Sequence, residues 1–87
     1  MSWRIAFTKK AQKQIDALEA NIRSRIKKSI LQKLSTNPDL YLEPLSGVFG
    51  EFYKFRVGDY RLICSKENEK LVIIVVEVGH RREVYNN

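Results

Sequence analysis

The segment Phe52-Tyr-Lys-Phe-Arg-Val-Gly-Asp-Tyr-Arg-Leu-Ile63 decides the fold, because apolar and basic residues alternate on both sides of a Gly-Asp pair. Alternation with a period of two is typical of a β-strand with one buried face. The pair Gly58-Asp59 favours a tight turn. The segment therefore predicts two strands joined at the turn. If their apolar side chains share the core side, the other side carries three cations with no carboxylate between them: Lys54, Arg56 and Arg61. Such a group suits a phosphate.

The residues that precede this segment predict one strand and two helices. Trp3, Ile5 and Phe7 alternate with small or polar residues, and Thr8 provides an N-cap hydroxyl for a helix over residues 9–18. Apolar residues at helical spacing from residue 22 to residue 34 predict a second helix, which ends before Pro38. The opposite face of this helix is basic and carries Arg23, Arg25, Lys27, Lys28 and Lys33. The short connection favours an antiparallel helical hairpin.

Residues 39–50 are predicted to be irregular, with Leu40, Leu42 and Leu45 available to pack on the core. The apolar run over residues 71–78 predicts a strand in the interior of the sheet, covered by helices on one side. The order of elements is then β-α-α-β-β-β. The predicted fold class is α+β, with the N-terminal helical hairpin packed on one face of a small, mainly antiparallel sheet.

Composition narrows the classes of function. A chain of 87 residues is expected to form a single domain over residues 1–87. Its net charge of +6 favours a polyanionic partner such as nucleic acid, an anionic membrane or an acidic protein. The single cysteine excludes an intramolecular disulfide and a cysteine-based zinc site. The carboxylates are scattered, so no metal or other cofactor is expected. Without a signal peptide or a membrane span, we expect a cytoplasmic protein with no membrane partner.

With these elements in place, Tyr53-Lys-Phe-Arg-Val-Gly-Asp-Tyr-Arg-Leu62 and Val78-Gly-His-Arg-Arg-Glu-Val-Tyr85 together resemble the RelE/ParE superfamily of type II toxin–antitoxin systems. The resemblance covers nearly the whole chain. It implies a toxin of the RelE branch, a ribosome-dependent mRNA endoribonuclease that cuts in the decoding A site, inhibits translation and is neutralised by a cognate antitoxin. By the same resemblance, the catalytic residues are Lys54, Arg61, Arg81 and Tyr85, and Arg56 binds RNA.

The chemistry expected of these residues is attack of the RNA 2′-hydroxyl on the adjacent phosphorus, with cations rather than a metal supplying the electrostatic stabilisation. Arg61 and Arg81 would bind two phosphate oxygens through their guanidinium groups. Their alternative role is a surface ion pair of little energetic value. Lys54 would stabilise the same charge or take part in proton transfer. Tyr85 would stack on a base, exchange a proton with the 2′-hydroxyl, or only cover the edge of the core.

Further RNA contacts are expected from His80 and from three residues of the basic helix, Arg23, Lys27 and Lys28, which would dock on ribosomal RNA. The alternative for the helix is a solvated basic face. Two other functions stay open: a ParE-like DNA gyrase inhibitor without nuclease activity, and a module that only binds its antitoxin and represses their operator. The partners implied are a cognate antitoxin, the ribosome and mRNA, with operator DNA for the toxin–antitoxin complex.

Overall fold

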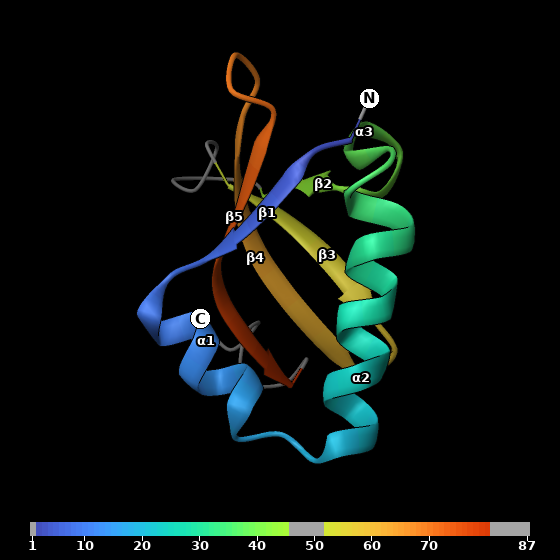
Figure 1. Ribbon diagram of the computed structural model, residues 1–87, viewed down its shortest axis with the longest axis vertical. Helices are drawn as coiled ribbons and strands as arrows, with labels where there is room; N and C mark the ends of the chain where they lie inside the picture. The colour runs from blue at the N-terminus through green and yellow to red at the C-terminus, as the bar shows by residue number, and fades with distance from the viewer. Residues whose placement is uncertain (1, 46–51, 81–87) are drawn as a thin grey trace.

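A computed structural model describes residues 2–45 and 52–80 of the chain (Figure 1). The elements follow in the order β1 (Arg4–Phe7), α1 (Lys9–Asp16), α2 (Ala20–Ser29), the π-helical turn η1 (Ile30–Leu34), α3 (Pro38–Tyr41), β2 (Glu43–Pro44), β3 (Tyr53–Val57), β4 (Tyr60–Glu67) and β5 (Val72–His80). The five strands lie in the order β1-β5-β4-β3-β2. Only the β1–β5 pair is parallel, and the other neighbours are antiparallel. The predicted α+β class with a mainly antiparallel sheet is confirmed.

Hydrogen bonds at Thr8 and Ser35 hold the two ends of β1, which is an edge strand of the sheet. The Thr8 hydroxyl accepts the N–H of Ala11 at 3.1 Å, as an N-cap of α1, and donates to the carbonyl of Val76 at 3.3 Å. An N-cap of this kind contributes about 1 kcal/mol. At the other end of β1, the N–H of Trp3 donates to the Ser35 carbonyl at 2.7 Å, and the Ser35 hydroxyl donates to the Trp3 carbonyl at 3.0 Å. The predicted cap is therefore confirmed.

The core lies between the sheet and the two helices, α1 and α2, which cover the same face (Figure 1). The predicted alternation holds in β3 and β4, because their core-facing side chains are buried while the residues between them point to the other face. Both strands are joined through Gly58, whose φ of +59° is the left-handed conformation that the predicted turn requires. The buried side chains come from helices and strands: Ala11, Ile15, Ile26, Ile30, Leu34, Leu42, Phe55, Val57, Leu62, Cys64, Ile73, Val75 and Val78.

The prediction that residues 39–50 are irregular is wrong for residues 39–41, which belong to the one-turn helix α3, and for residues 43–44, which form the strand β2. Leu42 is buried and closes α3 by donating its N–H to the Pro38 carbonyl at 2.8 Å. Leu40 points away from the core and is 66% exposed, so its predicted packing is wrong. A single helical turn can bury only one side, and the buried residue of α3 is Pro38. Leu45 is partly buried.

A β-bulge interrupts the pairing of β4 with β5. Ile63 pairs with Glu77 while Cys64 pairs with Val75, so Val76 is the extra residue. A bulge of this kind reverses the alternation of the strand that contains it. Val75 and Val78 therefore both reach the core, and Gly79 comes to lie opposite Arg61.

Cys64 is completely buried, and burial raises the pKa of its thiol from 9.0 to about 12. Above pH 9 the unfolded chain loses a proton that the folded chain keeps, so the free energy of unfolding falls as pH rises. Between pH 8.5 and 10.5, we expect the native protein to lose about 2 kcal/mol more stability than a Cys64→Ala variant. Urea unfolding of both proteins at each pH measures this difference. Equal losses in the two proteins would contradict it.

Candidate functional site

The sheet face opposite α1 and α2, here called the outer face, carries the basic residues of β3 and β4. Phe55 and Val57 point into the core, so the residues that alternate with them, Lys54 and Arg56, point to the outer face. Leu62 is likewise in the core, which places Arg61 on the outer face. The structure thus brings together three of the residues that the sequence selected.

Strand register places Arg56 directly opposite Arg61. Two like charges in this position repel each other and destabilise a sheet by about 0.2–1 kcal/mol. Lys54, two residues before Arg56, adds a third positive charge on the same face. On the other side of Arg61, its partner on β5 is Gly79, which has no side chain. A phosphate bound on the outer face would relieve the repulsion, so the register favours a polyanionic ligand.

The three cations differ in their exposure to solvent. Arg61 is buried, with 6% of its surface exposed, whereas Arg56 is exposed and the Lys54 side chain is 26% exposed. The burial of Arg61 differs from the alternative that the sequence left open for it, an exposed arginine at a strand end in a surface ion pair. A buried guanidinium has a fixed position and acts through a medium of lower dielectric constant than water. Arg61 is therefore a preorganised charge, and Arg56 is the cation that a ligand reaches first.

A carboxylate, Glu43, also lies on the outer face, where it stands beside Lys54 and not between the three cations. Glu43 pairs with Lys54 across the β2–β3 ladder, and its Oε1 lies 3.9 Å from the Lys54 Nζ. Sequence reasoning missed it because a two-residue strand shows no periodicity. The available signal was Pro44, since a residue that precedes proline favours extended backbone.

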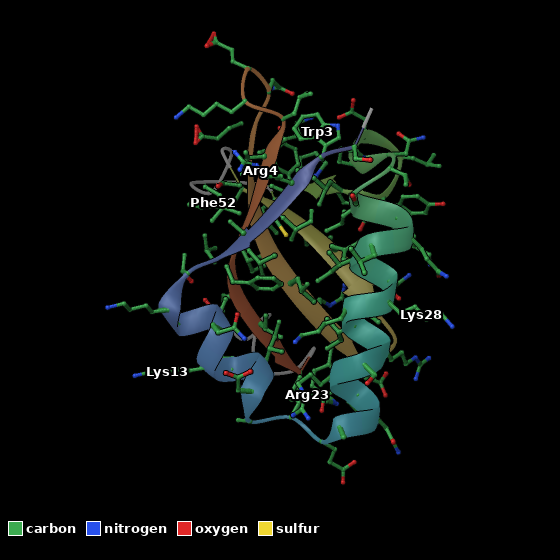
Figure 2. All side chains as sticks on the ribbon, viewed as in Figure 1. Trp3, Arg4, Lys13, Arg23, Lys28 and Phe52 are labelled. Atoms are coloured by element: carbon green, nitrogen blue, oxygen red, sulfur yellow. The ribbon has the colours of Figure 1, made fainter. Side chains whose placement is uncertain are left out.

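The other predicted site residues that the structure describes lie away from Lys54, on the helix side of the sheet or on the helices. His80 pairs with Tyr60 on the helix side of the sheet, where the two rings lie 5.5 Å apart at 77°. Lys27 and Lys28 are exposed on α2, and Figure 2 shows Lys28 pointing away from the sheet. Arg81 and Tyr85 lie outside the described residues.

Arg23 connects α1 to α2. Its Nη1 donates to the Leu18 carbonyl at 3.0 Å and to the Asp16 carbonyl at 3.5 Å, and Figure 2 shows it beside the connection between the two helices. These carbonyls lie at and just beyond the C-terminal end of α1, where a helix lacks internal donors. The structure thus gives Arg23 a structural role in the hairpin.

The helix side of the sheet contains a cavity of about 160 Å³ between α2 and the β3–β4 turn. Ligand pockets for small molecules usually measure about 300–1,000 Å³. The cavity is lined by Ile22, Arg25, Ile26, Val57, Asp59 and Tyr60.

Within residues 2–45 and 52–80, no three His, Cys, Asp or Glu side chains form a group that could hold a metal ion. In the same part of the chain, no helix is long and apolar enough to cross a membrane.

A helical hairpin on one face of a five-stranded sheet, with cations gathered on the other, defines a toxin of the RelE/ParE superfamily. Residues 5–85 match the family model described as ParE toxin of type II toxin–antitoxin system, parDE. The chain belongs to this family and is the toxin of a type II toxin–antitoxin system.

Several known toxins are similar to this chain over nearly all of their length. The mRNA interferase toxin RelE of Escherichia coli K12 is 30% identical over 89 residues, which cover 99% of this chain and 93% of the relative. The RelB–RelE antitoxin–toxin complex from Methanococcus jannaschii contains a chain that superposes with a TM-score of 0.68 at 28% identity, covering 93% of this chain and 95% of that chain. The toxin–antitoxin complex RelBE2 of Mycobacterium tuberculosis gives a TM-score of 0.87 at 23% identity, with 93% of both chains covered, and supports the fold.

Proposed function

We propose that this toxin is a ribosome-dependent mRNA endoribonuclease that cuts mRNA in the decoding A site and so inhibits translation. The observation that carries the proposal is the strand register that gathers Lys54, Arg56 and Arg61 on the outer face. The relative from Escherichia coli that bears the name mRNA interferase supports the same function. A ParE-like inhibitor of DNA gyrase is the alternative, and such a protein would have no need of a cationic cleavage site.

The proposed reaction is metal-free attack of the 2′-hydroxyl on the adjacent phosphorus. The pentacoordinate transition state carries additional negative charge on its phosphate oxygens, and fixed cations stabilise that charge without reorganising. Lys54, Arg61 and Arg81 supply the cations, and Arg56 binds a neighbouring phosphate of the strand. Tyr85 stacks on a base or exchanges a proton with the 2′-hydroxyl.

The partners follow from the same proposal. A cognate antitoxin neutralises the toxin, as the RelB–RelE complexes among its structural relatives suggest. The toxin acts in the cytoplasm, and its complex with the antitoxin binds operator DNA. The exposed Lys27 and Lys28 of α2 contact ribosomal RNA, on the side of the molecule away from the outer face. Contacts of this kind weaken as salt increases.

The function is tested by incubating the purified protein with mRNA, with and without programmed ribosomes, and mapping the cut ends by primer extension. We expect cleavage only on ribosomes, and we expect an Arg81→Ala variant to lose it. Cutting of free mRNA would contradict ribosome dependence. Intact mRNA together with DNA damage in cells, unchanged by Arg81→Ala, would instead favour a gyrase inhibitor.

A further inference from the structure

We propose that the cavity between α2 and the β3–β4 turn binds one pyrimidine base of single-stranded RNA and prefers cytosine. The inference rests on the proposed function in taking RNA as the ligand, but the binding itself is measured without cleavage. It assigns a ligand to the helix side of the hairpin, whose other side carries Arg56 and Arg61.

The size and the walls of the cavity fit a single aromatic ring. Its volume is about 160 Å³. In another protein, an apolar cavity of about 150 Å³ is large enough to bind one molecule of benzene. The volume therefore favours one six-membered ring over the two fused rings of a purine. Ile22, Ile26 and Val57 supply the apolar contacts, and the last two are themselves buried.

Tyr60 adds an aromatic side chain to the lining of the cavity. Tyr60 and Val57 are direct partners across the β3–β4 ladder, so their side chains point to the same side of the sheet. The Tyr60 ring packs edge to face against His80, with the ring centroids 5.5 Å apart and the planes at 77°. Unstacked RNA bases bind proteins by stacking on rings of this kind. A ring that is already restrained loses little freedom when a base stacks on it.

Arg25 and Asp59 bring a hydrogen-bond donor group and an acceptor group to the same cavity. The Arg25 guanidinium lies over the turn, because a Cβ atom placed on Gly58 would lie 3.6 Å from its Cζ and Nη2 and 3.8 Å from its Nη1. In the part of the chain that the structure describes, no ion pair joins Arg25 or Asp59 to each other or to another residue. Both side chains can therefore give hydrogen bonds to a ligand.

The two polar groups distinguish cytosine from uracil. Cytosine has an amino group at N4, whose N–H a carboxylate such as that of Asp59 can accept. It also has acceptors at N3 and O2, to which the Arg25 guanidinium can donate. Uracil has a carbonyl oxygen in place of the amino group, and two acceptors that face each other repel. The same cavity therefore binds cytosine more tightly than uracil.

The cavity and the cations of the outer face lie at the same end of one hairpin. Val57 and Tyr60 form the pair next to the turn and line the cavity, whereas Arg56 and Arg61 form the following pair and point to the outer face. An RNA strand with a phosphate on Arg56 can therefore turn a neighbouring base around the end of the hairpin. Contacts to phosphate position a strand and contacts to a base select its sequence, so the cavity supplies the second function.

Titration of the purified toxin with cytidine 5′-monophosphate and with uridine 5′-monophosphate tests the site. We expect the methyl NMR resonances of Ile22, Ile26 and Val57 to shift with the cytidine nucleotide, and the uridine nucleotide to bind about tenfold more weakly. Asp59→Asn should remove this preference, because an asparagine amide can donate to the uracil oxygen as well as accept from cytosine.

Arg25→Met should weaken the binding of the cytidine nucleotide about tenfold, because it removes the donor group and keeps much of the aliphatic chain. Lys28→Met is the matched control. It removes a cation from the same helix, but Lys28 is exposed and points away from the sheet (Figure 2), so this variant should bind like the native protein.

Three results would overturn the inference. One is that neither mononucleotide shifts the three sets of methyl resonances at millimolar concentration. Another is that both bind equally and Asp59→Asn changes nothing. The third is that phenylalanine amide shifts the resonances and the mononucleotides do not, which would assign the cavity to an aromatic side chain of a protein partner. Cleavage of mRNA on programmed ribosomes would leave the proposed function standing in each case. A toxin that binds the cytidine nucleotide with the stated preference but cuts no mRNA would instead overturn the proposed function alone.

Discussion

Replacing Lys54 with methionine is expected to slow mRNA cleavage on programmed ribosomes about 10²–10³-fold, the loss typical of removing one group that stabilises transition-state charge. Methionine keeps most of the aliphatic part of the side chain but removes the ammonium group beside Glu43 and on the same face as Arg61. The rate is measured with excess toxin, by primer extension, so that the chemical step is followed rather than product release. Ribosome binding, measured by co-sedimentation, should change far less than the rate.

Lys10→Met is the matched control for Lys54→Met. Lys10 also forms an ion pair with a glutamate, since its Nζ lies 3.4 Å from the Glu77 Oε1, but Lys10 belongs to α1 and not to the strands that carry Lys54, Arg56 and Arg61. The Lys10 variant should cut at the native rate, and urea unfolding should show both variants within about 0.5 kcal/mol of native stability. Cleavage by Lys54→Met within threefold of the native rate would show that the outer face is not the cleavage site.

Replacing Leu62 with alanine is expected to lower the free energy of unfolding by about 2–5 kcal/mol, the usual cost of a cavity in a core. Leu62 is completely buried and lies between Phe55 and Val78 in the sheet register. A chain of 87 residues has a total stability of only about 4–13 kcal/mol. Urea unfolding followed by circular dichroism measures the loss, which would leave a substantial fraction of the toxin unfolded if the native stability is at the low end.

Leu31→Ala provides the comparison for Leu62→Ala, because it removes the same atoms from a side chain that is 66% exposed. We expect it to change the free energy of unfolding by about 0.5 kcal/mol or less. Similar losses at the two positions would contradict the placement of Leu62 in the core.

The strands and helices with strong periodicity could be predicted from the sequence. The alternation around Gly58 gave β3 and β4 with the correct faces, and the helical spacing of Ile22, Ile26 and Ile30 gave the second helix. Thr8 was recognised as a cap because its hydroxyl precedes a helical pattern. These features are local, so a few neighbouring residues are enough to specify them.

Features that depend on distant contacts were not predictable from local patterns. β2 is two residues long and is defined by its pairing with β3. A segment this short shows no alternation of apolar and polar residues that would predict a strand. The bulge at Val76 depends on the register of β4 against β5. Alternation placed Arg61 on the outer face but could not show that it is buried there.

The candidate site was predicted in part for the same reason. Residues on adjoining strands, Lys54, Arg56 and Arg61, were assigned to one face from the hairpin alone. Lys27 and Lys28 belong to a helix, and whether that helix covers the same face as the cations depends on how the chain crosses the sheet. The structure places the helix on the opposite side of the sheet, so these exposed lysines are separated from the cations of the outer face.

The parallel pairing of β1 with β5 has a consequence for the synthesis of the toxin. Thr8 donates its hydroxyl hydrogen bond to Val76, which is added to the chain 68 residues later. At translation rates of about 5–20 residues per second, the first strand waits roughly 3–14 s for its neighbour to be made. A nascent chain that is released before Val72 lacks β5, the strand between β1 and β4, and therefore cannot close its sheet.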